Sequence, residues 1–274
     1  MPVWGIGGHP FIDLERYLDL RRLDAIDDEV SLSLAELGSR VPLEYTGGSH
    51  KTMGIVPPSL MDEPYRDYGQ VIRAMTRSQF EAFIALSDYA DEIDVDRRHE
   101  YEFGEEREWP LSKRQMLYLK FKYGVYFPWQ VFYEMVPCVD WEDKANGEGK
   151  DFTPEAKRCF PKLIAFVRSL PFKVIGRCNI LGLEANHHGT VHLDGDPEDP
   201  NADHFITICP RKDKRLFLWN EERREKTQVL SRAYWFNDHG YHGVEADPYF
   251  RYSIRVDGVF EEGFLRRLRN DWGF

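Results

Sequence analysis

Residues 242–258, with the sequence HGVEADPYFRYSIRVDG, form the stretch that decides the fold. β-branched and aromatic residues dominate its second half, FRYSIRV (250–256), and predict a strand. Short runs of the same kind lie upstream, separated by turn signals: residues 173–183, 204–209, 215–219 and 228–236. Short strands at this spacing indicate a closed or double-sheet β architecture, such as a jelly roll.

The first half of the chain has a helical pattern instead. Three segments are expected to be helices: residues 78–93, 112–123 and 153–169. The first two place apolar side chains near helical spacing. The third begins with a capping hydroxyl at Thr153 and a proline at Pro154, which suits a first helical turn, and it should stop before Pro171.

These patterns predict an α+β fold within one compact unit, residues 1–274. A mainly helical N-terminal part, residues 1–170, is expected to pack on a β core formed by residues 171–274. Residues 141–151 (WEDKANGEGKD) are polar and contain glycine, which is typical of a connector.

Composition excludes several classes of protein. The 274 residues are 42% hydrophobic and 30% charged, as in ordinary globular proteins. The net charge of −11 argues against nucleic acid and anionic membranes as partners, because phosphate binding needs clustered Lys and Arg. No apolar stretch is long enough for a bilayer, and the amino terminus lacks the pattern of a signal peptide. We therefore expect a cytoplasmic protein with a small-molecule substrate; its oligomeric state is not predicted.

His192 and Asp194 form the most informative motif. In a strand, residues i and i+2 point to the same side, so the imidazole and the carboxylate should project together. Six of the nine histidines lie between residues 187 and 242, which favours a site there. A third ligand must come from a distant strand, and His242 is expected to supply it. Two imidazoles and one carboxylate on a single face are the donor set of redox-active non-haem iron.

Residues 173–258 resemble the double-stranded β-helix core of the 2-oxoglutarate/iron(II)-dependent dioxygenases, a jelly-roll or cupin-like fold. The pattern is similar to the aspartyl/asparaginyl hydroxylase-like branch: His-x-Asp, a distal His about fifty residues later, and an Arg nine to thirteen residues after that. The resemblance implies iron(II) on His192, Asp194 and His242. It also implies that Arg251 and Ser253 bind the distal carboxylate of 2-oxoglutarate, with dioxygen as the second co-substrate.

Two positions of the motif have alternatives. His239 lies three residues before His242 and also falls within the family's spacing; we expect His242, because Gly243-Val244 continues the family pattern and begins a strand. Arg255 shares a strand face with Arg251, but the nine-residue spacing favours Arg251.

Other polar residues have more than one interpretation. Arg177 and Asn179 alternate onto one face, where they either help to hold the co-substrate or form polar pairs in the core. His187 and His188 are expected in a polar loop near the mouth of the site. His204, at the start of a strand, is expected to be structural.

The resemblance implies hydroxylation of a C–H bond, because related halogenases lack a carboxylate at the position of Asp194. The expected substrate is a free amino acid or small natural product, and the loop 195–203 is expected to border its pocket. The alternatives are a hydroxylase of peptide or protein side chains and a metal-dependent, non-redox enzyme on a cupin-like barrel. The second leaves Arg251 without a clear role.

Overall fold

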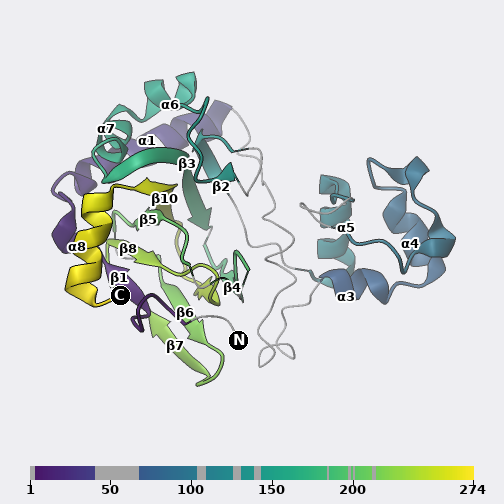
Figure 1. The fold of residues 1–274 in the computed structure, drawn as a ribbon. Helices are drawn as coiled ribbons and strands as arrows, with labels where there is room; N and C mark the ends of the chain where they lie inside the picture. The colour runs from purple at the N-terminus through teal and green to yellow at the C-terminus, as the bar shows by residue number, and fades with distance from the viewer. Residues whose placement is uncertain are drawn as a thin grey trace.

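The computed structural model describes residues 4–40, 68–103, 109–125, 131–138, 143–183, 185–196, 199, 201–211 and 214–274. The connector 141–151 and the loop 195–203 are therefore described only in part. Within these residues the chain forms two antiparallel sheets with helices around them (Figure 1). No helix in the described ranges has the length and apolar character that a membrane span requires.

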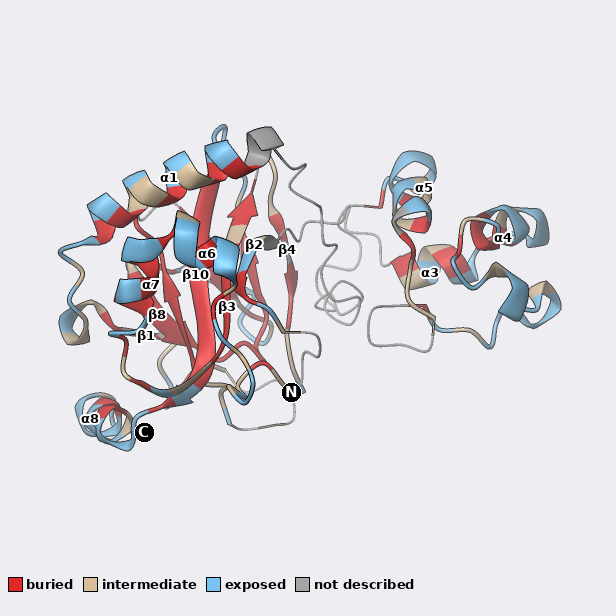
Figure 2. Ribbon diagram, turned by 90° about the horizontal axis from the view of Figure 1, so that it is seen from above, coloured by how far each residue is buried: buried red, intermediate tan, exposed pale blue. Residues whose placement is uncertain are grey.

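The larger sheet has six strands. Their order across the sheet is β1 (Phe11–Asp13), β8 (Ala233–Phe236), β5 (Phe205–Ile208), β10 (Arg251–Phe260), β3 (Phe172–Leu183) and β2 (Val131–Val136). All neighbouring strands are antiparallel. The long central strand β10 is buried at every position but Val259, as Figure 2 shows, because it is covered on both faces.

The smaller sheet has four strands, in the order β4 (Gly189–His192), β9 (His242–Val244), β6 (Leu216–Asn220) and β7 (Glu225–Gln228). Alternate residues of β6 point to opposite faces. Leu216 and Leu218 belong to the main hydrophobic core together with residues of the larger sheet. Phe217 belongs to a small separate cluster with Val191, Leu193 and Tyr241. The inner face of the smaller sheet therefore packs against the larger sheet.

Helices cover the outer face of the larger sheet. These are α1 (Leu23–Arg40), α6 (Pro154–Cys159) and α7 (Pro161–Val167), while α8 (Glu262–Trp272) follows β10 at the C-terminus. Ile26, Val30 and Leu163 are buried in the main core. The Tyr252 hydroxyl of β10 donates to Asp27 Oδ1 of α1 at 2.7 Å. Up to the register shift after Asp257, even-numbered residues of β10 thus face the helices, and odd-numbered residues face the smaller sheet.

Residues 68–125 contribute a second hydrophobic cluster that shares no residue with the main core. Its elements are α3 (Tyr68–Arg73), α4 (Arg77–Ile84), two 3-10 turns (Ala90–Glu92 and Val95–Arg97) and α5 (Lys113–Tyr123). Figure 1 shows these helices together on one side of the sheets. Capping boxes at Thr76 and Ser112 satisfy the first backbone N–H groups of α4 and α5.

Replacing Phe83 with alanine is expected to destabilise this second cluster by about 3–5 kcal/mol. Phe83 is fully buried and packs edge-to-face on Phe103 at 5.3 Å between ring centroids. Amide hydrogen exchange should show the loss of protection in residues 68–125, with the strands of the main core unchanged. The matched control is Phe121→Ala, because Phe121 is 77% exposed. Equal loss of protection in both regions would contradict the separation of the two cores.

Several expected elements are confirmed. The strands expected over 173–183, 204–209, 215–219 and 250–256 are β3, β5, β6 and β10, with small differences at their ends. The helix expected over 112–123 is α5, which begins after the Ser112 cap and ends at Gly124, a left-handed residue. The mixed α and β composition with antiparallel sheets is also confirmed.

Other boundaries were wrong, for local reasons. The helix expected over 78–93 ends at Ile84. The helix expected over 153–169 is divided at Pro161, whose ring and missing N–H interrupt a helix interior. The strand expected over 228–236 is two strands, with β7 ending at Gln228 and β8 beginning at Ala233.

The predicted division into a helical first half and a β second half does not describe the larger sheet. Strand β1 comes from residues 11–13 and β2 from residues 131–136, and both pair with strands of the second half. Both are short edge strands. The prediction of one compact unit over residues 1–274 stays a prediction.

Candidate metal centre

Two histidines lie side by side in the smaller sheet and face the larger one. His192 is the last residue of β4 and His242 the first of β9, and the antiparallel register places them directly opposite each other. Their ring centroids are 4.3 Å apart, and both side chains are almost completely buried. The sheet register therefore brings together two imidazoles that are fifty residues apart in the chain.

Asp194 completes this group from the segment after β4. Its Oδ1 lies 3.4 Å from His192 Nε2, and its Oδ2 lies 3.7 Å from His242 Nε2. All three donor atoms lie within 4.8 Å of one another. Ligand bonds of about 2.0–2.2 Å place neighbouring donors roughly 3–4 Å apart, so small side-chain adjustments would let one ion bind all three. The donor set, two neutral nitrogens and one carboxylate on one face, fits iron(II).

A backbone contact sets the tautomer of His242. The Nδ1 atom of His242 lies 2.9 Å from the carbonyl oxygen of Gly240. Because a carbonyl can only accept, Nδ1 carries the proton, and Nε2 keeps its lone pair toward Asp194. This is the usual arrangement of a metal-binding histidine, in which the other ring nitrogen is oriented by a hydrogen bond.

The carboxylate of Asp194 stays ionised. Burial would raise the pKa of Asp194, but its interactions with the neighbouring His192 and His242 hold that pKa well below its ordinary value. The backbone N–H of Asp194 also donates to the carbonyl of Asp238 at 2.8 Å, which anchors the segment after β4 to the turn before β9. An ionised, anchored carboxylate is the form that binds a metal.

Arg255 of β10 reaches Asp194 from the larger sheet. Its Nη1 donates to Asp194 Oδ2 at 3.4 Å, its Nη2 to Asp238 Oδ2 at 2.5 Å and its Nε to Asp257 Oδ1 at 2.9 Å. The guanidinium also lies 3.9 Å from the centroid of the Phe205 ring. Each nitrogen of this buried arginine therefore has a carboxylate partner.

Arg177 and Asn179 lie on the inner face of β3, beside β10. Arg177 pairs with Asp257, with its Nη2 2.8 Å from Oδ2. Asn179 stands opposite Arg255 in the register and is 2% exposed. The sequence left open whether Arg177 helps to hold the co-substrate or forms a polar pair in the core, and in the structure it forms a polar pair with Asp257.

Arg251 and Ser253 lie on the same face of β10 as Arg255, farther from the histidines. At about 3.3 Å per residue, the Cα atoms of residues 251 and 255 are roughly 13 Å apart. Arg251 is fully buried, and its Nη2 donates to the carbonyls of His187, at 3.0 Å, and Glu245. Ser253 is 2% exposed. The structure thus places this pair in the interior between the sheets, beyond the metal-binding group.

His239 belongs to a different group, with Asp203 and Asp238. Its Nε2 lies 3.5 Å from Asp203 Oδ2, and the hydrogen bond to Asp203 raises the pKa of His239. Lys144 lies 2.6 Å from the same Asp203 oxygen and 3.5 Å from Asp238 Oδ2. Because Lys144 and Arg255 already neutralise these carboxylates, this second group is an ionic cluster that needs no metal.

The remaining histidines of this region lie in varied places. The backbone carbonyl of His187 accepts a hydrogen bond from Arg251, so the loop that contains His187 lies near Arg251. His188 is half-buried, and burial lowers its pKa. His204 stacks on Phe260 at 4.6 Å and an interplanar angle of 12°, a packing contact.

Four charged residues around the site were not identified from the sequence: Lys144, Asp203, Asp238 and Asp257. The position of Asp257 near the site could have been inferred from the sequence, because Asp257 lies two residues after Arg255 and must share its strand face. Lys144 carried no such signal, since it lies in the polar segment expected to be a connector, although it is only 6% exposed in the structure.

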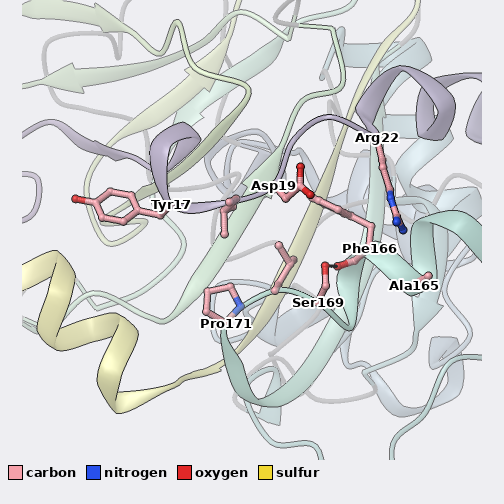
Figure 3. A pocket seen from close by; sticks show the side chains of 9 residues that line it. Tyr17, Asp19, Arg22, Ala165, Phe166, Ser169 and Pro171 are labelled. Atoms are coloured by element: carbon pink, nitrogen blue, oxygen red, sulfur yellow. Dashed lines mark hydrogen bonds between the residues drawn. The ribbon is translucent and has the colours of Figure 1, made fainter.

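A surface hollow of about 330 Å³ lies elsewhere, between the start of α1 and the end of α7 (Figure 3). Its lining includes Tyr17, Arg22 and Phe166. None of the lining residues belongs to the metal-binding group or to the strands that carry it.

No protein-family model matches the chain, and no curated protein matches it either. Solved structures similar to it include an oxidoreductase of the 2OG-Fe(II) oxygenase family from Burkholderia pseudomallei, with 15% identity, a TM-score of 0.30, and coverage of 46% of this chain and 69% of that one. Another is a prolyl-4-hydroxylase from Pseudomonas putida, with 11% identity, a TM-score of 0.26, and coverage of 40% and 66%. At these values neither structure assigns a role to any residue here, and the function must be argued from the site.

Proposed function

We propose that this chain is a 2-oxoglutarate- and iron(II)-dependent dioxygenase that hydroxylates a C–H bond of a small molecule. The observation that carries the proposal is the buried group of His192, Asp194 and His242. Three ligands on one face leave the other face of an octahedral ion open for a chelating co-substrate and dioxygen. A closed structural metal site would instead supply four protein ligands.

The order of the strands supports a double-stranded β-helix. Strands β3 to β10 alternate between the two sheets, except for the pair β6–β7 within the smaller sheet: β3, β5, β8 and β10 lie in the larger sheet, and β4, β6, β7 and β9 in the smaller. In such a winding, the end of β4 and the start of β9 meet inside the sandwich, where His192 and His242 lie. The jelly-roll assignment is part of the proposal.

Arg251 and Ser253 are the residues that we propose for the distal carboxylate of 2-oxoglutarate. The structure argues against Arg255 in this role, because each of its nitrogens already has a carboxylate partner. Arg251 is oriented by two backbone carbonyls, and one carboxylate approaches it, with Asp247 Oδ2 3.8 Å from its Nε. A guanidinium fork can bind a carboxylate through two parallel hydrogen bonds, and the Ser253 hydroxyl can add a third.

The chain's own residues would bind, orient and shield the reactants. Bound iron(II), with 2-oxoglutarate and dioxygen, supplies the oxidising chemistry; one oxygen atom enters the substrate and the other enters succinate, with release of carbon dioxide. The burial of the two histidines excludes bulk water from the inner side of the site. Asp194 holds the position that a halide would need, which favours hydroxylation.

The proposed substrate class rests on the charge of the chain. A net charge of −11 disfavours nucleic acid, so we propose a free amino acid or small natural product. The aspartyl/asparaginyl hydroxylase-like branch and a cytoplasmic location also stay predictions.

The test of the proposed function is an anaerobic titration of the metal-free protein with iron(II) and 2-oxoglutarate. A weak visible charge-transfer band should appear when both are present and should be absent in His192→Ala, which lacks one of the two imidazole ligands. In air, the wild type should release succinate, and a panel of amino acids should identify substrates that stimulate the release. Absence of both the band and succinate would overturn the oxygenase assignment.

A further inference from the structure

We propose that Arg255 is a positioning residue for the metal-binding carboxylate: it engages one oxygen of Asp194 and so favours binding of the metal through the other oxygen. The inference rests on the proposed metal centre and deepens it. A carboxylate that binds through one oxygen occupies one coordination position, whereas two-oxygen binding would use a second. Arg255 thereby helps to keep the open face of the ion free for the co-substrate and dioxygen.

The contacts of Arg255 join three separate parts of the fold. Asp194 follows β4 in the smaller sheet, Asp238 lies in the turn before β9, and Asp257 lies on β10 itself. Arg255 donates to all three, at 3.4, 2.5 and 2.9 Å. Because Asp238 and Asp257 hold two of its nitrogens, the third nitrogen has little freedom and points at Asp194 Oδ2. The direction of the contact is thus set by residues that are not metal ligands.

Burial makes this contact effective. Arg255 is 6% exposed, and the face of Phe205 lies 3.9 Å from its guanidinium carbon. A planar guanidinium held against an aromatic ring keeps its orientation, and charge-assisted hydrogen bonds are stronger where water is excluded. Loss of a residue that orients a metal ligand from outside typically costs about 10–100-fold in metal affinity.

Arg177 offers a matched control within the same network. It is buried to the same degree as Arg255, at 7% exposure, and pairs with the same Asp257, at 2.8 Å. Its ion pair and its side-chain hydrogen bond are both with Asp257, which is not a metal ligand. Substitutions at Arg177 should therefore disturb the network and the stability of the sheet without reorienting the metal-binding carboxylate.

The test compares two pairs of variants, Arg255→Met with Arg177→Met and Arg255→Lys with Arg177→Lys. The probe is cobalt(II), whose affinity is measured by competition with a chelator at a temperature at which each variant is folded, as checked by circular dichroism. We expect Arg255→Met to lose about 10–100-fold in cobalt(II) affinity, the usual effect of removing an outer partner of a ligand. Arg255→Lys should keep the positive charge but lose the planar, multi-donor geometry of the guanidinium, and its cobalt(II) affinity should fall about tenfold.

A second readout separates positioning from a general loss of structure. If Asp194 turns to bind through both oxygens in Arg255→Met, the visible d–d absorption of cobalt(II) should weaken, because it falls as the coordination number rises. The Arg177 variants should keep the wild-type affinity and spectrum even where their melting temperature falls.

The outcomes distinguish the inference from the function on which it rests. Wild-type affinity in folded Arg255→Met, or an equal loss in Arg177→Met, would overturn the role of Arg255 and leave the metal centre standing. If Arg255→Met does not fold, Arg255→Lys decides, and wild-type affinity there would overturn the inference. A wild-type protein that binds neither cobalt(II) nor iron(II) would overturn both proposals.

Discussion

His242→Ala is expected to abolish the iron(II)–2-oxoglutarate chelate, whereas His239→Ala should leave it intact. His242 supplies one of only three protein ligands, and its Nε2 lies with the donor atoms of His192 and Asp194. The loss should exceed the roughly 10–100-fold that removal of an outer partner costs. The measurements are the anaerobic visible spectrum and the release of succinate in air.

His239→Ala is a closely matched control. Both rings are imidazoles in the same segment, and both are buried, with 2% exposure for His242 and 5% for His239. His239, however, faces Asp203 in the ionic cluster with Lys144. If His239→Ala removed the chelate and His242→Ala kept it, the third ligand would move to His239, and the proposed geometry of the site would be wrong.

Asp257→Ala is expected to lower the free energy of unfolding by about 3–5 kcal/mol, the typical cost of leaving buried charges without their partner. Asp257 is 1% exposed and lies between two buried arginines. Arg177 Nη2 lies 2.8 Å from one of its oxygens, and Arg255 Nε donates to the other at 2.9 Å. Burial would raise the pKa of Asp257, but Arg177 and Arg255 hold it below its ordinary value, so the carboxylate is charged at neutral pH.

Chemical denaturation of the metal-free protein measures this effect. The control is Asp19→Ala, which removes an ion pair with Arg21 on the surface, where the two side chains are 54% and 87% exposed. That variant should unfold at the wild-type denaturant concentration, because exposed pairs contribute little. A similarly small effect for Asp257→Ala would show that water reaches Arg177 and Arg255 and that their ion pairs with Asp257 are solvated.

Local patterns predicted much of the β core and part of the helices. The strand 250–256 and the helix 112–123 were found because their periodicity and caps are properties of neighbouring residues. Errors came where a single residue overrides the pattern, as at Pro161, which divides one predicted helix into two. Short edge strands such as β1, with three residues, carry too few positions for an alternating pattern to appear.

The site was predicted in the same uneven way. His192 and Asp194 could be expected together because they are two residues apart at the end of a strand, although β4 ends at His192 and Asp194 lies just after it. Periodicity alone could not separate Arg251 from Arg255, because both lie on the same face of β10, and only the nine-residue spacing of the family pattern favoured Arg251. Arg251 has two backbone carbonyls and one carboxylate around it, whereas Arg255 has three carboxylates. His187, Asp194 and Asp238, which supply part of these surroundings, lie far from β10 in the chain.

The sequence by itself determined that the second half of the chain forms short strands and that His192 and Asp194 lie close together. It also determined that imidazole and carboxylate groups are available to bind a metal. Only the tertiary structure decided which distant groups meet them. The register of β4 against β9 brings His242 opposite His192, and the packing of the two sheets brings Arg255 to Asp194. The physical reason is that periodicity acts between neighbours along the chain, whereas register and sheet packing depend on the burial of the whole core.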